Sequence, residues 1–149
     1  MFKFRLQRVL DLRARTEEDA AIRLAAAREA AEQARAAYER LEATRRASRA
    51  QAQPAAGTAA SVGELQYQQF VVERLDEHLA EAHRTAEAAE GEARQRLEQL
   101  TAAMQDRRVL DKLRERHLEA WRSAETQAER VSMDAVALAR FALAPKAAQ

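Results

Sequence analysis

A regular alternation of four- and three-residue spacings runs through the first third of this chain. Two helices that supercoil around each other bring a residue back to the shared side every 3.5 residues, so this spacing is typical of a coiled-coil seam. Most of the residues in the series are Leu or Ala. The series comprises Leu6, Leu10, Arg13, Glu17, Ala20, Leu24, Ala27, Ala31, Ala34, Tyr38 and Leu41.

The same alternation begins again at Val72 and continues almost to the end of the chain. Two equally spaced seams in one chain, separated by a single interruption, predict an all-α fold: a long antiparallel two-helix coiled-coil hairpin whose second helix is the longer. The second series comprises Val72, Leu75, Leu79, Ala82, Ala86, Ala89, Ala93, Arg96, Leu100, Ala103, Arg107, Leu110, Arg114, His117, Trp121, Ala124, Ala128, Val131, Ala135, Leu138 and Ala142.

The interruption contains Pro54 and Gly57, which disfavour a continuous helix. Directly after it, Ser61 and Glu64 have the spacing of a capping box, in which each side chain bonds a backbone amide at the helix start. We therefore expect a single hairpin domain over residues 1–149. Its helix 1 covers about 3–51, its loop about 52–61 and its helix 2 about 62–143.

Folding the chain at a midpoint near Thr58 pairs seam residues whose numbers sum to roughly 113–117. Tyr38 and Leu41 then face the group of Val72, Leu75 and Leu79, and Glu17 lies within about one layer of Arg96. The spacing leaves the choice between adjacent registers open. The middle layers are nearly all Ala, so each buries little area and is expected to stabilise the hairpin weakly.

Helix 2 is expected to extend beyond helix 1 by some thirty residues, ~45 Å at the rise of an α-helix. The seam positions continue along this extension and have no partner within the chain. A second copy of the chain or a different protein must cover them. Tyr67, Phe70 and Val71 lie off the main seam near the loop and are further candidates for outward contact.

Charge is unevenly distributed along a chain whose net charge is only +1. Basic residues gather where the two helix ends meet, namely Lys3, Arg5, Arg8, Arg13 and Arg15 with Arg107, Arg108, Lys112, Arg114 and Arg116. The loop-proximal part of helix 2 is acidic, with Glu73, Asp76, Glu77, Glu81, Glu87, Glu90 and Glu92.

Several functional classes receive no support from the residues. Cys is absent, and His78 and His83 are five apart, so they do not share a helix face as a metal pair would. No Gly-rich phosphate loop or nucleophile with a local base is present, so we expect no enzyme activity, no cofactor and no metal site. No apolar run approaches the ~20 residues of a membrane span.

Periodicity alone therefore indicates a coiled-coil interaction protein. Two alternatives stay open: a spacer or weak homodimer that pairs through the Trp121 stripe, and a nucleic-acid-binding coiled coil that uses the basic end. The second alternative is disfavoured because no aromatic residues are interleaved with the basic ones.

Three motifs, in order, give a resemblance to the FliJ family of the bacterial flagellar type III export apparatus. The first is Phe4-Arg5-Leu6-Gln7-Arg8-Val9-Leu10-Asp11-Leu12-Arg13, which resembles the opening pattern of that family. The second is Tyr67-Gln68-Gln69-Phe70, followed by Leu75-Asp76. The third is Val109 to Arg116, with Trp121 and then Met133-Asp134 through Arg140-Phe141.

The resemblance implies a two-helix coiled coil similar to the stalk subunit of rotary ATPases. It also implies a protein at the cytoplasmic face of the flagellar base, peripheral to the membrane through protein partners. The implied partners are the hexameric export ATPase FliI, the export gate protein FlhA and export chaperones. For the ATPase ring it suggests Arg5, Arg8, Arg13, Arg114, Arg116 and Trp121. For the gate it suggests Tyr38, Leu41, Phe70, Leu75, Leu79 and His83. The stalk proteins of injectisome-type secretion share this plan and remain an alternative.

Overall fold

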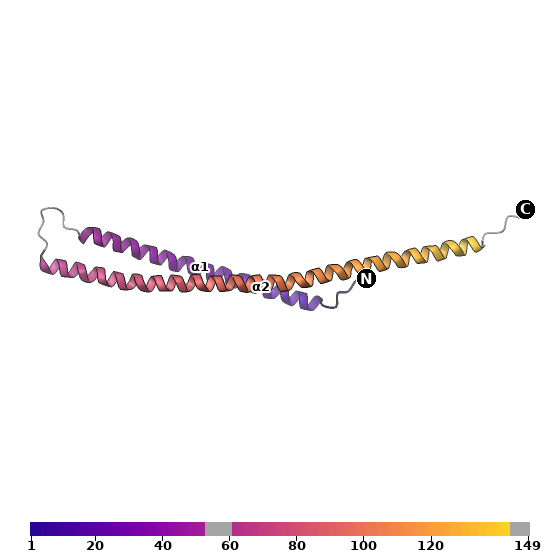
Figure 1. The fold of residues 1–149 in the computed structure, drawn as a ribbon, viewed down its shortest axis with the longest axis horizontal. Helices are drawn as coiled ribbons and strands as arrows, with labels where there is room; N and C mark the ends of the chain where they lie inside the picture. Colours follow the sequence, from indigo (N-terminus) through magenta and orange to yellow (C-terminus); the bar gives the residue numbers. More distant parts are fainter. Residues whose placement is uncertain (53–60, 144–149) are drawn as a thin grey trace, which may run out of the picture. The chain divides into compact units, whose positions relative to one another are not determined.

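The computed structural model describes residues 1–52 and 61–143, and these residues form two α-helices and no strand. Helix α1 is Gln7–Ala52 and helix α2 is Val62–Leu143, of 46 and 82 residues (Figure 1). The expected all-α hairpin with a longer second helix is confirmed. Most of the expected loop, at about 52–61, lies outside the described residues.

Helix α1 begins later than the expected start near Lys3. The amide of Gln7 donates to the carbonyl of Phe4 at 3.1 Å, and the amide of Leu10 donates to the carbonyl of Leu6 at 2.9 Å. This turn ends the N-terminal segment, residues 1–6, which is not helical. Residues 3–6, which the seam pattern placed in helix 1, are therefore not helical.

The capping box at the start of α2 is confirmed. The amide of Ser61 donates to Glu64 Oε2 at 2.8 Å, and the amide of Glu64 donates to Ser61 Oγ at 3.2 Å. Two amides that lack helical partners are thus satisfied reciprocally. At its other end, α2 stops at Leu143, just before Pro145, as expected.

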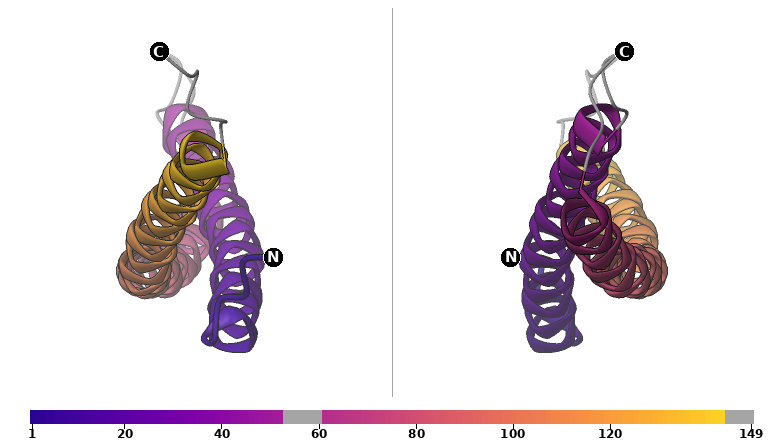
Figure 2. Two further views of the ribbon diagram at one scale, coloured as in Figure 1. Left: turned by 90° about the vertical axis from the view of Figure 1, so that its right-hand side faces the viewer. Right: turned by 90° about the vertical axis from the view of Figure 1, so that its left-hand side faces the viewer.

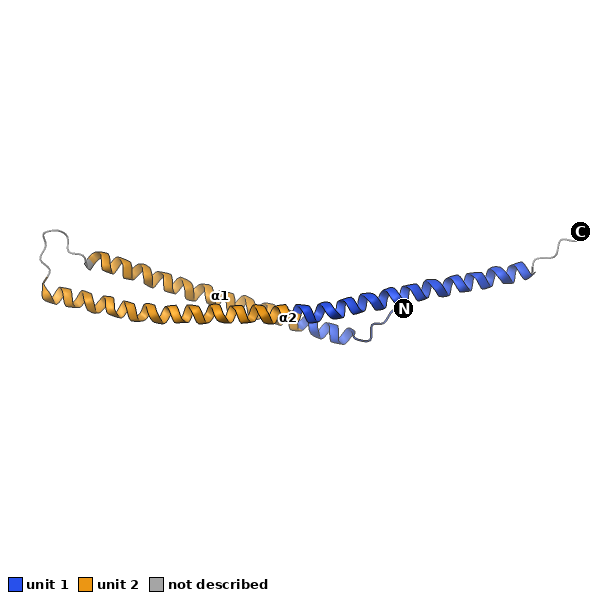
Figure 3. Ribbon diagram, viewed as in Figure 1, with its two compact units in different colours: residues 1–15, 104–149 blue, residues 16–103 orange. Residues whose placement is uncertain are grey.

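The chain divides into two compact units, shown in different colours in Figure 3. Unit 1 consists of residues 1–15 and 104–149, and unit 2 consists of residues 16–103. Each unit contains a piece of α1 and a piece of α2. The two end-on views of Figure 2 show the same two helices without a strand among the described residues. The grouping of residues 1–149 into one domain stays a prediction.

In unit 2, the two predicted seams face each other. Leu24, Ala27 and Ala86 are buried, with 5%, 8% and 8% of their surfaces exposed. The remaining seam positions from Glu17 to Leu41 and from Val72 to Ala103 are half-buried. Ile22, which lies off the seam, is 62% exposed. The 3.5-residue alternation therefore identified the packed faces of both helices.

In unit 1, the buried residues are Leu10 and Phe4, of which only Leu10 belongs to the predicted seam. Beyond Trp121 the α2 surface is exposed up to Ala142. Val131 and Leu138 on the predicted stripe are 63% and 70% exposed. The expected extension of α2 is present, and it begins after Trp121, because the N-terminal segment contacts α2 at His117 and Trp121.

The register differs from the expected facing numbers. Tyr38 contacts His83, with ring centroids 5.4 Å apart, and Arg35 reaches Glu90 at 3.7 Å. Seam position Tyr38 therefore faces Ala82, whereas the expectation placed it opposite Leu75 or Leu79. The helices adopt the next register along α2, which carries Glu17 past Arg96. Arg96 instead bonds Glu92 on its own helix at 3.1 Å.

Ion pairs between the helices match the observed register. Arg35 and Arg49 are two heptads apart on α1, and they pair with Glu90 and Asp76, which are two heptads apart on α2. Arg45, on the seam itself, also contacts Asp76. A slip of one heptad toward the expected register would remove both arginines from Asp76 and bring Glu42 beside it. Like charges at such flanking positions oppose pairing, so these ion pairs favour the observed register over its neighbour.

Leu24 provides a test of the seam. Leu24→Ala removes the most buried side chain of unit 2 and leaves a gap, so we expect a loss of about 2–3 kcal/mol in the free energy of unfolding. Ile22→Ala, two residues away and exposed, should change it by less than about 0.5 kcal/mol. Urea unfolding followed by circular dichroism measures both. Equal losses would contradict the assigned packing face.

Disulfide cross-linking provides a test of the register, because the chain contains no Cys. The observed register places Ala34 opposite Ala86, and the expected one placed it opposite Leu79. Ala34→Cys/Ala86→Cys should form a disulfide under mild oxidation, seen as a faster band in non-reducing electrophoresis. Ala34→Cys/Leu79→Cys is the matched control and should remain reduced. The reverse result would assign the other register.

Candidate partner-binding surfaces

The small net charge of the chain conceals two strongly and oppositely charged units. Unit 1 carries 14 basic and 8 acidic residues, a net charge of +6. Unit 2 carries 11 basic and 16 acidic residues, a net charge of −5. The basic cluster and the acidic stretch expected from the sequence therefore belong to different units. A partner that approaches unit 1 meets a positive field, and one that approaches unit 2 meets a negative field.

The predicted ring-binding arginines have different surroundings within unit 1. Arg13 Nη1 pairs with Asp106 Oδ2 at 3.1 Å and joins α1 to α2. Arg5, Arg8, Arg114 and Arg116 are exposed, and none of them has an ion-pair partner among the described residues. Arg13 thus has a structural role, whereas the other four present their guanidinium groups to solvent.

Trp121, the sixth predicted ring-binding residue, is half-buried because Phe2 packs on it. The two ring centroids are 6.1 Å apart at an interplanar angle of 52°. Phe4 packs edge-on against His117, with ring centroids 5.8 Å apart and an interplanar angle of 82°. The expectation that Trp121 opens an uncovered stripe is corrected: its ring is already in contact with the N-terminal segment.

The N-terminal segment also encloses a hollow against α2. The hollow has a volume of about 360 Å³ and is lined by Phe2, Lys3, Phe4, Gln7 and Arg114. The seam argument did not identify this site because it treated residues from Lys3 onward as helix. A signal was nevertheless present in the sequence. Two Phe residues with one residue between them project to the same side of an extended segment, but to different sides of a helix.

The predicted gate-binding residues divide by exposure. Phe70 is 57% exposed and lies off the seam, as does Tyr67 at 69%. Leu41, Leu75 and Leu79 are half-buried in the seam of unit 2. Their main contribution is therefore to packing between the helices, and of the aliphatic and aromatic candidates Phe70 presents the most surface to a partner.

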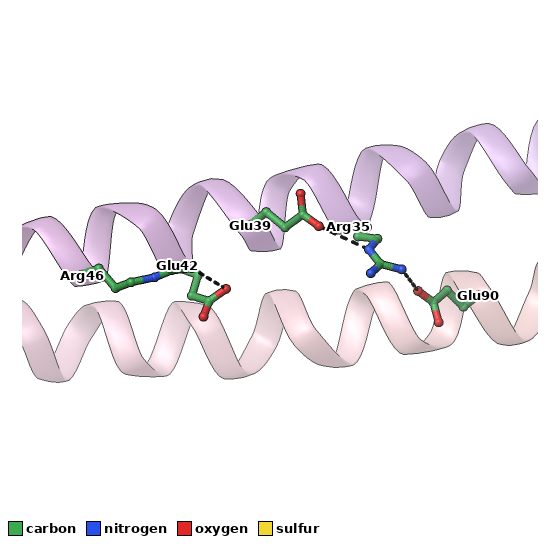
Figure 4. Close-up of polar contacts among 5 residues, drawn as sticks. All are labelled: Arg35, Glu39, Glu42, Arg46 and Glu90. Atoms are coloured by element: carbon green, nitrogen blue, oxygen red, sulfur yellow. Dashed lines mark hydrogen bonds and ion pairs between the residues drawn. The ribbon is translucent and has the colours of Figure 1, made fainter.

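Tyr38 and His83, the last two gate candidates, lie beside a groove of about 460 Å³ between α1 and α2 of unit 2. Figure 4 shows Arg35 of α1 between two glutamates, at 3.3 Å from Glu39 and 3.7 Å from Glu90. Glu42 pairs with Arg46 on its own helix at 3.2 Å. His83 Nδ1 lies 3.5 Å from Glu87. Charged side chains therefore cover this part of the seam, where the core itself is mostly Ala.

The described helices show no stretch long and apolar enough to cross a membrane. Within residues 1–52 and 61–143, no group of three or more His, Asp or Glu side chains is placed to hold a metal ion.

Comparison with protein families gives a match over nearly the whole chain. The family described as "Flagellar FliJ protein" matches residues 2–146, which is nearly the whole chain. No curated protein and no solved structure gives a significant match. The matched region includes the two helices, the N-terminal aromatic residues and the stripe of α2 that follows Trp121. This chain belongs to the FliJ family, whose members are components of the flagellar export apparatus.

Proposed function

We propose that this protein is a stalk-like component that binds the hexameric export ATPase FliI through unit 1 and the export gate protein FlhA through unit 2. The single observation that carries the proposal is the separation of charge, with +6 on one unit and −5 on the other. Two surfaces of opposite sign on one chain suit two partners of different charge. The proposal places the protein at the cytoplasmic face of the flagellar base.

Unit 1 suits weak and exchangeable contact with an acidic surface. The guanidinium groups of Arg5, Arg8 and Arg116 are exposed and have no ion-pair partner among the described residues, so binding them does not require an internal pair to break. Each exposed ion pair contributes only about 0–1 kcal/mol. Several together steer a partner and hold it while allowing it to exchange, which a stalk inside a working ring requires.

Unit 2 suits a partner that uses an aromatic anchor. Phe70 projects from α2 next to half-buried Val71 and within one turn of Tyr67. Aromatic residues in such positions are common binding hot spots, whereas the seam leucines would have to leave their own core to reach a partner. We therefore assign the gate contact mainly to Phe70, with Tyr38 and His83 as a second aromatic pair.

Export chaperones are the third partner class in the proposal. The uncovered stripe of α2 from Ala124 to Leu138 offers apolar surface for them. The homodimer alternative is less favoured, because its expected anchor Trp121 already contacts Phe2 and is half-buried.

Reversal of charge on unit 1 tests the ATPase contact. Arg5→Glu/Arg8→Glu/Arg116→Glu changes the charge of unit 1 by six without breaking an ion pair that the structure shows. We expect at least a tenfold loss of affinity for the export ATPase and a matching loss of ATPase stimulation. Both losses should be smaller at high salt, because salt screens the charges. Calorimetry at two salt concentrations and a phosphate-release assay measure these effects.

The matched control makes the same charge change on unit 2. Arg40, Arg84 and Arg94 are exposed and have no ion-pair partner among the described residues. Arg40→Glu/Arg84→Glu/Arg94→Glu should leave ATPase affinity within about threefold of the original, since these residues lie on the other unit. Similar losses in both variants would show that only the total charge matters.

Phe70→Ala tests the gate contact. We expect a loss of about ten- to thirtyfold in affinity for the cytoplasmic domain of FlhA with an unchanged melting temperature, because Phe70 is exposed. Leu75→Ala should lower both affinity and melting temperature, because Leu75 supports the seam. The control is Phe141→Ala, which removes an aromatic ring that is 84% exposed on unit 1. Binding of Phe70→Ala at the original affinity would remove the aromatic anchor from the proposal.

A further inference from the structure

The hollow between the N-terminal segment and α2 has the construction of a small binding pocket. Phe2 and Phe4 contribute apolar atoms to its lining, Lys3 adds a cation from the N-terminal segment and Arg114 adds one from α2. Its volume, about 360 Å³, suits one or two amino-acid side chains.

Packing fixes the two phenylalanines beside this shallow hollow. Phe4 is only 9% exposed and contacts His117, and Phe2 contacts Trp121. The turn from Phe4 to Gln7 fixes the other end of the segment to the start of α1. Two ring contacts and a backbone hydrogen bond thus position Lys3, which lies between the two phenylalanines, without a contribution from a ligand.

The charges in the pocket are uncompensated. Lys3 and Arg114 have no ion-pair partner among the described residues. Nearby Arg13, in contrast, is paired with Asp106 at 3.1 Å. Gln7 Nε2 donates to Asp11 at 2.9 Å, which leaves the side-chain carbonyl oxygen of Gln7 as an acceptor. The pocket therefore offers two cations, one hydrogen-bond acceptor and two phenyl rings.

We propose that this pocket binds an acidic peptide segment in which an Asp or Glu lies next to an apolar residue. The carboxylate would pair with Lys3 and Arg114, and the apolar side chain would pack mainly on Phe2, because Phe4 is almost fully buried. The side-chain oxygen of Gln7 would accept a hydrogen bond from a backbone amide of the segment. The inference rests on the proposed function in one respect: it assigns this segment to the surface of the export ATPase that meets unit 1.

A peptide fits the pocket better than a nucleic acid. A phosphate backbone presents charges in a row and no apolar group beside them, whereas the pocket places its two cations beside phenyl walls. In a peptide, an acidic residue directly followed or preceded by Leu or Phe supplies both a negative charge and an adjacent apolar side chain. Binding of duplex DNA that competes with the peptide is an outcome that would overturn this choice.

A short synthetic peptide tests the pocket without the ATPase. The probe is acetyl-Gly-Leu-Asp-Phe-Gly-amide, titrated into the full chain and followed by the fluorescence of Trp121, the only Trp of the protein. The same peptide with Asn in place of Asp is the control. We expect the Asp peptide to bind at least fivefold more tightly. Equal affinities, or displacement of the Asp peptide by duplex DNA, would overturn the proposal.

Variants of the pocket extend the test to the ATPase. Lys3→Met/Arg114→Met removes both charges and leaves an unbranched, flexible side chain at each position. Arg15→Met/Arg108→Met is the control, since both residues are exposed in unit 1 outside the pocket and have no ion-pair partner among the described residues. The pocket variant should lose the preference for Asp and at least tenfold in ATPase affinity, and the control less than threefold.

The outcomes separate this inference from the proposed function. Equal loss of ATPase affinity in the pocket variant and the control would reject the pocket and keep a general role for the charge of unit 1. Preference for the Asp peptide, combined with ATPase affinity that no variant of unit 1 changes, would keep the pocket and reject the proposed function. Circular dichroism of each variant confirms that the helices are retained.

Discussion

Pairing of α1 arginines with α2 carboxylates distinguishes the observed register of unit 2 from its neighbours. The middle of the seam in unit 2, from Ala20 to Ala34 and from Ala82 to Ala93, is mostly Ala, and layers of such small side chains bury little area in any register. Arg35 with Glu90, and Arg45 and Arg49 with Asp76, recur at matching intervals on the two helices. Every one of these pairs takes its cation from α1 and its anion from α2. They therefore favour the pairing of α1 with α2 over the pairing of either helix with a second copy of itself.

The same pairing determines which charges remain available to partners. Arg13 is used within unit 1, and Arg35, Arg45 and Arg49 are used within unit 2. The cations without such pairs are concentrated in unit 1, which carries a net charge of +6. A protein with almost no net charge can thus present a strongly basic surface and a strongly acidic one. Family membership assigns it to the flagellar export apparatus, and this charge separation supports the division of partners proposed for its two units.

The candidate sites were predictable to different degrees. The outward position of Phe70 and the basic cluster followed from residue spacing, because a helix fixes the direction of each side chain. The separate role of Arg13 did not follow, since its partner Asp106 lies more than ninety residues away in the sequence. The pocket of Phe2, Lys3, Phe4 and Arg114 was also not predictable. Continuation of the seam pattern into Leu6 suggested a helix, whereas packing of two phenylalanines against His117 and Trp121 favours a non-helical segment.

The amino-acid sequence by itself determined the two helices, their packed faces, the capping box at Ser61 and the excess length of α2. Each of these follows from local residue preferences and from the heptad spacing within a single helix. The tertiary structure alone decided the register, the cover that Phe2 provides for Trp121 and the identity of the free cations. These depend on small energy differences between long-range pairings. Seam positions repeat every heptad, so several alignments satisfy the pattern equally well, and only the three-dimensional contacts of particular charged and aromatic side chains distinguish among them.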